Sequence, residues 1–515
     1  YSWLLGLAML VFKPSAYWEF SVVRLVNFTI FLGALAAFEF FLGELLKHQE
    51  AKIDGDGDVM GLPRWSWRII GYALFLYTSL MMNRVSRTSP DVCVSAFVYL
   101  SAGICLRIRR GRGTRLAYGL LGVVLALAYL TKAGMFPLAF IFMGVSLFLY
   151  ADARKALPRV LVTLLTFLLV ACPFVFALSK AKGRLTVGDT GKLNYAWHVN
   201  GVTTFIHWQG EGDGNGAPLH PSRKIFDSPA VYEFATPVGG SYPPWYDPGY
   251  WYEGVETHFH LRRQARVLLR NLLGVYSTLF LIRIFLGGLT FGLLILFIMG
   301  GRGRRVLRDV SAYWFLYVPS VLMIALYLLV HVEDRYLAPF VVLIFAGLFG
   351  GVRLPNSETS RRLVLAVTLS VGAMFTLSIL PTFARAGYRT VSEVVRGRAA
   401  QNDAEWQVAD ALTRNGIRAG DSVASIGNTM FASWHRLSRV RVVAEISQRS
   451  GGEVEKFWRA DESLRGQVVE AFKRTGARAI VAENTGNQAV GGEWQRVGTT
   501  NYYVLYLKSD ANREP

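Results

Sequence analysis

One short segment of the sequence gathers several ionisable side chains between two apolar runs. Residues 331–336 read His-Val-Glu-Asp-Arg-Tyr, and the apolar runs 310–330 and 336–352 flank them. Charges beside membrane-length apolar runs must each find a partner or a ligand, because an isolated charge there is costly. Such a group is therefore a candidate functional site. The candidate binding residues in this segment are His331, Glu333, Arg335 and Tyr336.

A second polar turn lies between two earlier apolar runs and ends in an acid. It carries Arg84, Arg87 and Asp91. The tripeptide Ser89-Pro90-Asp91 matches a helix start, since serine caps a helix, proline suits its first position and an acid complements the helix dipole. Alternatively, Asp91 is a functional residue, because an ionisable group beside an apolar run is costly and is a functional candidate by default. Both roles for Asp91 remain open from the sequence.

Two further cations stand at or within apolar runs. Lys132 follows the run 116–131, and Arg283 lies inside the run 273–299. Long basic side chains at such positions often extend to the membrane surface, which is the structural explanation. The alternative is a functional role, because ionisable residues within or beside membrane spans are costly. Both residues are therefore candidate binding residues beside the two polar turns.

The apolar runs indicate a polytopic membrane protein. The chain has 515 residues, of which 52% are hydrophobic and 18% charged. A soluble chain is about a quarter charged, so the composition argues against an ordinary cytosolic enzyme. The expected fold is mainly α: a membrane helical bundle of about ten spans, with an outer loop domain and a C-terminal soluble α/β domain. The expected spans fall near residues 21–45, 68–83, 91–107, 116–131, 134–150, 160–178, 273–299, 310–330, 336–352 and 363–382.

The basic residues predict which ends of these spans face the cytoplasm. The net charge is +19, and arginine and lysine cluster in four short connections. By the positive-inside rule these connections are cytoplasmic. The two polar turns, the loop 179–272 and the tail after residue 383 are then all on the outer face. Because topology and the tail account for the excess charge, no nucleic-acid partner is expected. The four connections lie near residues 107–115, 154–159, 302–308 and 353–362.

The tail 383–515 has the pattern of a small soluble α/β domain, and residues 1–382 are expected to form the membrane domain. A helix that begins after Asn402 or Asp403 and a later helix at 464–475 alternate with strand-like runs. No residues in the tail match a catalytic arrangement, so we interpret it as a packing or docking module. The expected strands are 422–426, 440–446 and 479–482, with a hairpin of 494–498 and 502–507.

Three glycine-rich or acid-rich motifs depart from the ligand-binding loops that they resemble. The acids of 54–58 begin like a calcium loop, yet Val59 stands where that loop needs glycine. The segment 188–192 lacks the glycine spacing of a phosphate loop, and no strand precedes the glycines of 210–216. None of the three motifs supports a ligand site.

The outer loop 179–272 is rich in aromatic residues and histidine. Aromatic belts form at membrane interfaces, which is the structural explanation. Alternatively, the rings could line a sugar-binding vestibule, because aromatic faces pack on the apolar faces of sugars while polar neighbours bind hydroxyls. These residues are Trp197, His198, His207, Trp208, His220, Trp245, Tyr246, Tyr250, Trp251, Tyr252, His258 and His260.

The order of these motifs resembles that of the GT-C glycosyltransferases, the membrane enzymes that include protein O-mannosyltransferases and bacterial aminoarabinose transferases. The stretch 1–46 is similar to the end of their first outer loop and the span that follows. Residues 84–91, Arg-Val-Ser-Arg-Thr-Ser-Pro-Asp, resemble the family's arginine-rich turn with its second acid. Leu-Thr-Lys at 130–132 and Glu-Asp-Arg-Tyr-Leu-Ala-Pro at 333–339 resemble two further family motifs. The resemblance covers most of residues 1–382.

The resemblance implies a transferase that moves a hexose or pentose from a polyprenyl-phosphate carrier to an acceptor at the outer face of the membrane. The acceptor would be a lipid, a glycan or a protein, and a divalent cation is the one cofactor left open. The absence of extended low-complexity segments favours the bacterial inner membrane as the setting, with the outer loop and C-terminal domain on the periplasmic side. Membrane lipids would surround the bundle.

The resemblance also implies roles for the polar residues. Asp91 would be catalytic, helping to activate the acceptor hydroxyl, and the cations would stabilise the leaving phosphate. The family's principal catalytic acid is expected upstream of Tyr1. The implied substrate-binding residues are Arg84, Arg87, Lys132, Arg283, His331, Glu333, Arg335 and Tyr336.

Two other functions fit the same composition. A secondary transporter or flippase would line a central path with its intramembrane charges, although the sequence has no visible internal repeat or paired interrupted helices. A non-catalytic membrane protein could instead use its outer domains to bind envelope glycans. Both alternatives remain open from the sequence.

Overall fold

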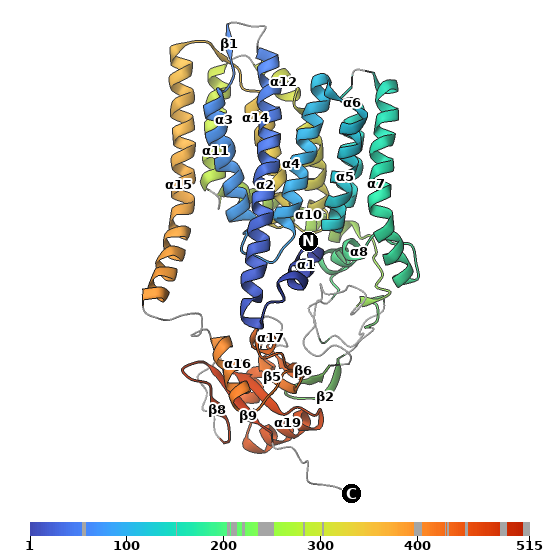
Figure 1. Cartoon of the computed structure of the whole chain (residues 1–515), viewed down its shortest axis with the longest axis vertical. Coiled ribbons are helices and arrows are strands. Elements are labelled where there is room, and N and C mark those ends of the chain that lie inside the picture. The colour runs from blue at the N-terminus through green and yellow to red at the C-terminus, as the bar shows by residue number, and fades with distance from the viewer. Residues whose placement is uncertain are drawn as a thin grey trace. The chain divides into compact units, whose positions relative to one another are not determined.

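A computed structural model of the chain contains two compact units. Figure 1 shows the helices of the first unit and the mixed sheet of the second. The first unit comprises Tyr1–Lys13, Phe20–Asn194 and Phe259–Ala386; the second comprises Pro14–Glu19, Tyr195–His258 and Gly387–Pro515. The structure describes residues 1–53, 58–150, 152–202, 207, 214–218, 222–234, 252–281, 284–300, 303–395, 404–427, 429, 432–448, 452–484 and 492–507.

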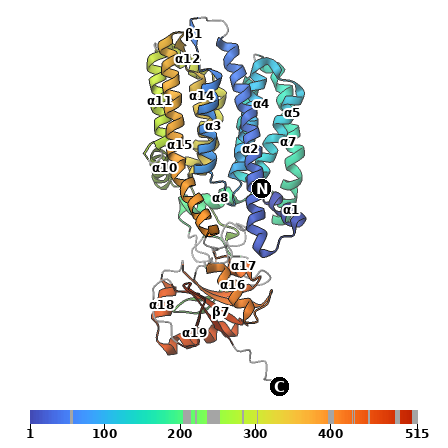
Figure 2. The same ribbon diagram turned by 60° about the vertical axis from the view of Figure 1, so that its left-hand side comes forward.

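The first unit is a bundle of apolar helices (Figure 2). Its helices begin and end at residues suited to those positions. Thr114 caps α5, its side-chain oxygen accepting a hydrogen bond from the backbone of Ala117 at 3.2 Å, and Gly183 ends α7 in the left-handed conformation. The helices are α1 (Ser2–Phe12), α2 (Ala16–Ile53), α3 (Arg64–Tyr77), α4 (Asp91–Arg107), α5 (Arg115–Thr131), α6 (Phe136–Phe148), α7 (Ala153–Lys182), α8 (Thr190–Tyr195), α10 (Leu261–Tyr276), α11 (Ile284–Gly300), α12 (Gly303–Ser311), α13 (Trp314–Leu328), α14 (Asp334–Gly350) and α15 (Glu358–Val395).

Short elements connect several of these helices. They include the π-helical turns η1 (Thr78–Met82), η2 (Ile108–Arg112), η4 (Ala196–Asn200) and η5 (Ser277–Leu281), and the 3-10 turn η3 (Ala133–Met135). A two-stranded antiparallel sheet joins β1 (Val59–Met60) to β4 (Leu354–Pro355). The connection between α5 and α6 is therefore a single tight turn, and Lys132 lies in it.

In the described part of the chain, four helices are long and apolar enough to cross a membrane, or up to six spans exist if each of two bent helix pairs is one span. The ten spans expected from the sequence are therefore not supported. The difference arises because several apolar runs form short helices: α5 and α14 have 17 residues each, and α6 has 13. A 17-residue helix is about 26 Å long, which is less than a hydrocarbon core of about 30 Å. The four helical segments are Ala16–Lys52, Asp91–Arg112, Arg154–Lys182 and Glu358–Tyr388.

Helices α5 and α7 pack closely because Gly122 of α5 has no side chain. A Cβ atom at this position would collide with the Thr166 hydroxyl and the Thr163 carbonyl of α7. The Thr163 hydroxyl also donates a hydrogen bond to the carbonyl of Tyr118 at 2.9 Å. Small and hydroxyl-bearing residues commonly allow such close helix contacts in membranes. The contact fixes the position of α5, which Lys132 directly follows.

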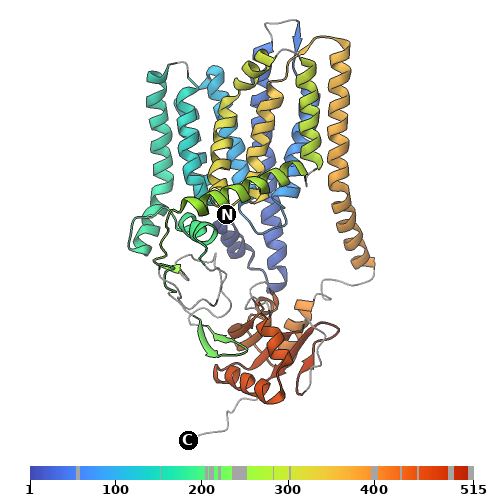
Figure 3. The same ribbon diagram turned by 180° about the vertical axis from the view of Figure 1, so that it is seen from behind.

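Helix α10 runs across the bundle. The axis of α10 and η5 meets that of α11 at 80°, and Figure 3 shows α10 as the yellow-green helix lying across the upright helices. The side chain of Gln264 donates to the carbonyl of Leu329 at 2.7 Å, and that of Asn271 donates to the carbonyl of Leu328 at 2.9 Å. These two bonds attach α10 to the end of α13.

The second unit is built on a seven-stranded sheet with strand order β2-β3-β6-β5-β7-β9-β8. Strands β6, β5 and β7 are parallel, and the outer pairs are antiparallel. Ile426, Ile446 and Ile480 of the parallel strands pack with Phe457 and Phe472 of the helices to form its core. The elements are β2 (Arg223–Phe226), β3 (Val231–Glu233), α16 (Ala404–Arg414), β5 (Ser422–Gly427), α17 (Trp434–Leu437), β6 (Arg441–Ser447), α18 (Glu453–Arg459), α19 (Glu462–Arg474), β7 (Ala479–Glu483), β8 (Gln495–Arg496) and β9 (Tyr502–Tyr506).

The expected strands of the tail correspond to β5, β6 and β7, and the expected hairpin corresponds to the antiparallel pair β8–β9. The sequence analysis did not predict β2 and β3, which lie in the loop 179–272. Strand β3 pairs with β6, with Tyr232 opposite Glu445. Residues 195–258 therefore belong to the same compact unit as the tail, although the sequence grouped them with the membrane domain as an outer loop.

Candidate functional site

Asp91 forms ion pairs with two cations from distant parts of the chain. Its Oδ1 lies 2.7 Å from Nζ of Lys132, and its Oδ2 lies 3.6 Å from Nε of Arg335. Asp91 is the first residue of α4, Lys132 directly follows α5, and Arg335 is the second residue of α14. The ends of three helices thus bring together three residues that the sequence analysis selected separately.

The Asp91 carboxylate is buried, with only 4% of the side chain exposed, whereas Lys132 and Arg335 keep 23% and 25% of theirs. A carboxylate withdrawn from water needs such partners, because its desolvation is costly. Burial lowers the pKa of the Lys132 ammonium, and the Asp91 carboxylate opposes that shift. The partly exposed cations are the groups that an anionic ligand could reach.

Ser89 orients the Asp91 carboxylate. Its hydroxyl donates to Oδ2 of Asp91 at 2.5 Å and accepts a bond from the backbone N–H of Asp91 at 3.2 Å. Asp91 lies in the first turn of α4, where an acid complements the helix dipole. Its two carboxylate oxygens nevertheless contact Ser89, Lys132 and Arg335, and no side-chain bond caps α4 at Pro90. The helix-start explanation therefore accounts for the position of Asp91 but not for its contacts.

The turn before α14 supplies the second acid of the site. Glu333 Oε2 lies 2.8 Å from Nε of Arg335, and its Oε1 accepts a bond from an Nη of Arg335 at 3.1 Å. Nε2 of His331 lies 3.5 Å from the same Oε1. The hydrogen bond from His331, assisted by Arg335, lowers the pKa of Glu333 to about 2. With Asp91 and Lys132, Glu333 and Arg335 make a cluster of two carboxylates and two basic side chains.

Tyr336 forms an aromatic wall beside these charges. The ammonium of Lys132 lies 3.8 Å from the centroid of the Tyr336 ring, within cation–π range. The Tyr327 ring stacks on Tyr336 with centroids 5.1 Å apart. Together Asp91, Lys132, Glu333, Arg335 and Tyr336 form what we call the Asp91 cluster.

Arg84 and Arg87 lie in the same polar turn as Ser89, and both are exposed. The side chain of Asn27 holds this turn by donating to the carbonyls of Val85 at 3.2 Å and Arg87 at 3.0 Å, and its own oxygen accepts a bond from the Tyr1 hydroxyl. Arg84 has φ = 54°, which is unusual for a residue other than glycine. In the part of the chain that the structure describes, neither guanidinium contacts the Asp91 cluster. Arg283 lies outside the described residues.

Some contacts of the site had no signal in the sequence. The Tyr327 ring reaches the site from α13, and the Thr278 hydroxyl of η5 donates to Asp334 at 3.2 Å. Asn27 lies within an apolar helix, where a single amide gives no motif. Ser89 stands two residues before Asp91, and this spacing could have indicated that the serine hydroxyl orients the Asp91 carboxylate.

A metal ion has no evident place in the site. Among the residues that the structure describes, no group of three or more His, Cys, Asp or Glu side chains is arranged to hold one. Asp91 is neutralised by Lys132 and Arg335, and Glu333 is bonded to Arg335 and His331. Because both carboxylates already pair with basic side chains, they do not suit the divalent cation that the sequence left open.

Several residues of the expected sugar-binding vestibule lie outside the described residues: Trp208, His220, Trp245, Tyr246, Tyr250 and Trp251. His207 is described and is buried in the second unit. Its Nε2 lies 2.6 Å from Oε1 of Glu445, and its Nδ1 lies 3.1 Å from the Ser222 hydroxyl. His207 thus attaches the loop to the sheet and does not line an open surface.

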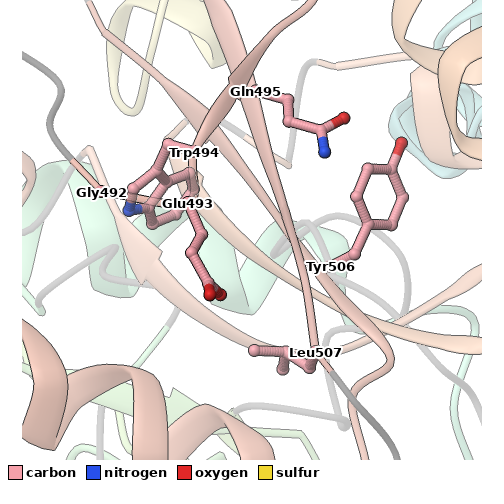
Figure 4. A pocket seen from close by; sticks show the side chains of 6 residues that line it. All are labelled: Gly492, Glu493, Trp494, Gln495, Tyr506 and Leu507. Atoms are coloured by element: carbon pink, nitrogen blue, oxygen red, sulfur yellow. The ribbon is translucent and has the colours of Figure 1, made fainter.

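The second unit also has a hollow of about 540 Å³ beside the β8–β9 hairpin. Figure 4 shows that its aromatic rings, Trp494 and Tyr506, lie apart and do not face each other, with Glu493 between them. Trp494 packs on Trp458 at 5.6 Å, and the Tyr506 hydroxyl donates to the carbonyl of Ala411. Because these side chains are engaged in packing and do not converge, the hollow is a weaker candidate than the Asp91 cluster.

Comparison with protein-family models, with curated proteins and with solved structures finds no match for the chain. The functional interpretation therefore depends on the chemistry of the residues described above.

Proposed function

We propose that the protein is a GT-C-like glycosyltransferase that moves a sugar from a polyprenyl-phosphate carrier to an acceptor hydroxyl. The observation that carries this proposal is the pairing of buried Asp91 with the partly exposed cations Lys132 and Arg335. An anionic leaving group and a hydroxyl nucleophile require these two kinds of residue: cations for the phosphate and a carboxylate for the proton.

In the proposed reaction, the acceptor oxygen attacks the anomeric carbon and the bond from that carbon to the carrier phosphate breaks. The phosphate oxygen keeps the electron pair of the broken bond. Lys132 and Arg335 bind this oxygen and stabilise its charge as it develops. The Tyr336 ring holds the Lys132 ammonium in place through a cation–π contact.

Asp91 receives the proton of the acceptor hydroxyl in this proposal. In the described structure Ser89, Lys132 and Arg335 occupy both oxygens of the Asp91 carboxylate. In this proposal the donor phosphate draws the two cations toward itself, which leaves a carboxylate oxygen open to the acceptor hydroxyl. Donor binding and acceptor binding are then coupled through one set of ion pairs.

Glu333 and His331 have a supporting role. The contacts of Glu333 hold the Arg335 guanidinium in place, so loss of Glu333 weakens phosphate binding indirectly. Arg84 and Arg87 are exposed on a turn fixed by Asn27. They are available to bind a second anionic group of the donor or acceptor, and Arg283 retains the same proposed role.

In this proposal, the orientation of the helices in the membrane follows the positive-inside rule. The polar turns face the outer side of the bacterial inner membrane, and the shorter apolar helices α5, α6 and α14 complete the bundle by local thinning or by packing inside it. The second unit, including the strands of the loop, lies on the same outer side. A polytopic bundle of about ten crossings thus remains part of this proposal.

The competing transport function rests on the same intramembrane charges. A transporter would carry its ion or substrate past these groups, whereas the Asp91 cluster joins the ends of helices in short turns. This position is better suited to a reaction at the membrane surface than to a path through the bundle. We therefore favour transfer over transport.

The direct test is transfer of radiolabelled sugar from polyprenyl-phosphate carriers to lipid, glycan or peptide acceptors. The protein, expressed from its complete open reading frame, is reconstituted in liposomes and supplied with mannosyl, arabinosyl or aminoarabinosyl donors. We expect labelled product from at least one donor, and at least about tenfold less of it after Asp91→Asn. Uptake of label into liposomes without product would favour transport and contradict the proposal.

A further inference from the structure

Helix α10 presents three different faces around its circumference. Successive residues turn by about 100°, so positions three, four or seven apart share a face. Gln264, Val267 and Asn271 are buried and make the first face. The second face carries Arg262, Arg266 and Arg270, all exposed, and the third carries Leu261, Ala265, Leu268, Leu272 and Tyr276.

The apolar face is not covered by the rest of the described chain. On this face Leu261 is 72% exposed and Leu272 is 45% exposed, and Leu269 and Leu273, which lie toward the arginine side, are each 60% exposed. Contiguous exposed leucines on one helix mark a contact surface, because such a patch is unfavourable in water. The helix contains four arginines and no acid. A basic face beside an apolar face is the pattern of helices that lie in a membrane surface.

The direction of α10 agrees with such a position. Its axis meets that of α11 at 80°, and the two helices together qualify as one bent membrane segment. If α11 follows the membrane normal, α10 runs nearly parallel to the surface (Figure 3). Side chains on its opposite sides then reach different depths, with leucines toward the hydrocarbon and arginines toward the phosphate groups.

We infer that α10 lies in the membrane surface, where its leucine face enters the lipid and Arg262, Arg266 and Arg270 bind phosphate groups of anionic phospholipids. Arginine suits this role because its planar guanidinium binds a phosphate through two parallel hydrogen bonds. The inference goes beyond sugar transfer and does not require it.

The position of α10 also affects the Asp91 cluster. Gln264 and Asn271 bond the carbonyls of Leu329 and Leu328, just before the turn 331–336, and Thr278 bonds Asp334 within it. A lipid contact that fixes α10 therefore fixes the turn that holds Glu333 and Arg335. Anionic lipid acts as a structural ligand of this turn.

The depth of α10 can be measured with nitroxide labels. Cys172 is exposed and Cys93 and Cys105 are buried, so Leu272→Cys and Arg270→Cys, which lie on opposite sides of α10, are each made in a Cys172→Ser background. In vesicles of phosphatidylglycerol and phosphatidylcholine, we expect the label at 272 to meet oxygen more readily than an aqueous nickel chelate. The label at 270 should show the opposite preference. Equal access of the nickel chelate to both labels would overturn the inference.

The lipid preference is tested separately by thermal unfolding in detergent. Added phosphatidylglycerol should raise the unfolding midpoint of the natural protein by several degrees more than added phosphatidylcholine. The triple variant Arg262→Gln/Arg266→Gln/Arg270→Gln should lose most of that difference. A matched variant, Arg414→Gln/Arg459→Gln/Arg474→Gln, removes three exposed arginines of the second unit and should keep it.

Two controls complete this test. The α10 variant should match the natural protein in phosphatidylcholine, which shows that it folds, and inorganic phosphate should not replace phosphatidylglycerol. An unchanged phosphatidylglycerol effect in the α10 variant would refute the lipid site. Neither measurement involves sugar transfer, so failure here is distinguishable from failure of the proposed enzyme activity.

Discussion

Nζ of Lys132 lies 2.7 Å from Oδ1 of Asp91 and 3.8 Å from the centroid of the Tyr336 ring. The lysine is thus held between a carboxylate and an aromatic face that come from different helices. The Lys132 side chain is mostly buried, so these two neighbours, more than water, stabilise its charge. Removal of either neighbour therefore makes the charged form of Lys132 less favourable. The predictions for the site depend on this arrangement.

Asp91→Asn should lower turnover in the transfer assay by at least about tenfold, which corresponds to roughly 1.4 kcal/mol of transition-state stabilisation. The amide cannot accept the proton and no longer balances two cations. The double variant Asp91→Asn/Lys132→Met should lose less than the sum of the single losses, since the two residues form one pair. Strictly additive losses would contradict the coupling of Asp91 to Lys132.

Arg335→Ala should also reduce turnover by at least about tenfold, because the proposed phosphate loses one of its two cations. Arg335→Lys should recover only part of the activity, since an ammonium cannot make the paired contacts of a guanidinium. Arg361→Ala removes an exposed arginine of α15 and serves as the matched control. Equal activity of Arg335→Ala and Arg361→Ala would remove Arg335 from the site.

Glu333 should give stability that depends on pH. Its pKa falls from an ordinary value of about 4.5 to about 2, because His331 and Arg335 favour the charged form. The contribution is therefore complete above about pH 4.5 and is lost as the pH falls toward 2. The unfolding midpoint of Glu333→Gln, measured by calorimetry, should lie below that of the natural protein at pH 6, and the gap should narrow at pH 3. If the difference in unfolding midpoint between the two proteins grew as the pH fell, it would contradict a lowered pKa of Glu333 in the folded protein.

Gly122→Val should destabilise the bundle, because a Cβ at this position collides with α7. Overpacking typically costs about 1–3 kcal/mol, and displacement of backbone places this site toward the upper end. Gly144→Val is the matched control, since no atom lies within 4 Å of a Cβ built there. A difference in unfolding midpoint between the two variants is the expected result, with Gly122→Val lower.

His207→Ala should destabilise the second unit by about 1–3 kcal/mol, because it leaves Oε1 of buried Glu445 without its hydrogen-bond partner. Glu445→Gln should cost less, since an amide can still bond to the imidazole. Limited proteolysis of the reconstituted protein measures the effect, as an unfolded second unit is cleaved first. Similar resistance of His207→Ala and the natural protein would show that the pair does not hold the loop to the sheet.

The sequence predicted the local features of the site better than its assembly. The acid–arginine turn and the lysine after an apolar run are visible because charges are rare beside such runs. Their contact depends on helix ends that the sequence does not align, so the ion pair of Lys132 with Asp91, 41 residues apart, could not be read from spacing. Tyr327 and Thr278 also escape detection, because a single polar atom on an apolar helix has no pattern.

The fold, like the site, was predicted only in part from the sequence. Alternating and β-branched residues predicted β5, β6 and β7 in the tail, whose boundaries agree within one or two residues. The number of spans was overestimated because apolar composition does not report where a helix ends. Strands β2 and β3 were missed since they are short and lie in a loop rich in glycine and aromatics. Their partner, β6, is about two hundred residues away along the chain.

That distance has a consequence for how the protein is made. During synthesis, β2 and β3 emerge long before β6, so the edge of β3 that pairs with β6 stays unpaired while the residues between them are made. A fragment of residues 383–515 has the reverse defect: the free edge of β6 is left open to pair with other chains. The second unit is thus complete only when an early and a late part of the chain meet.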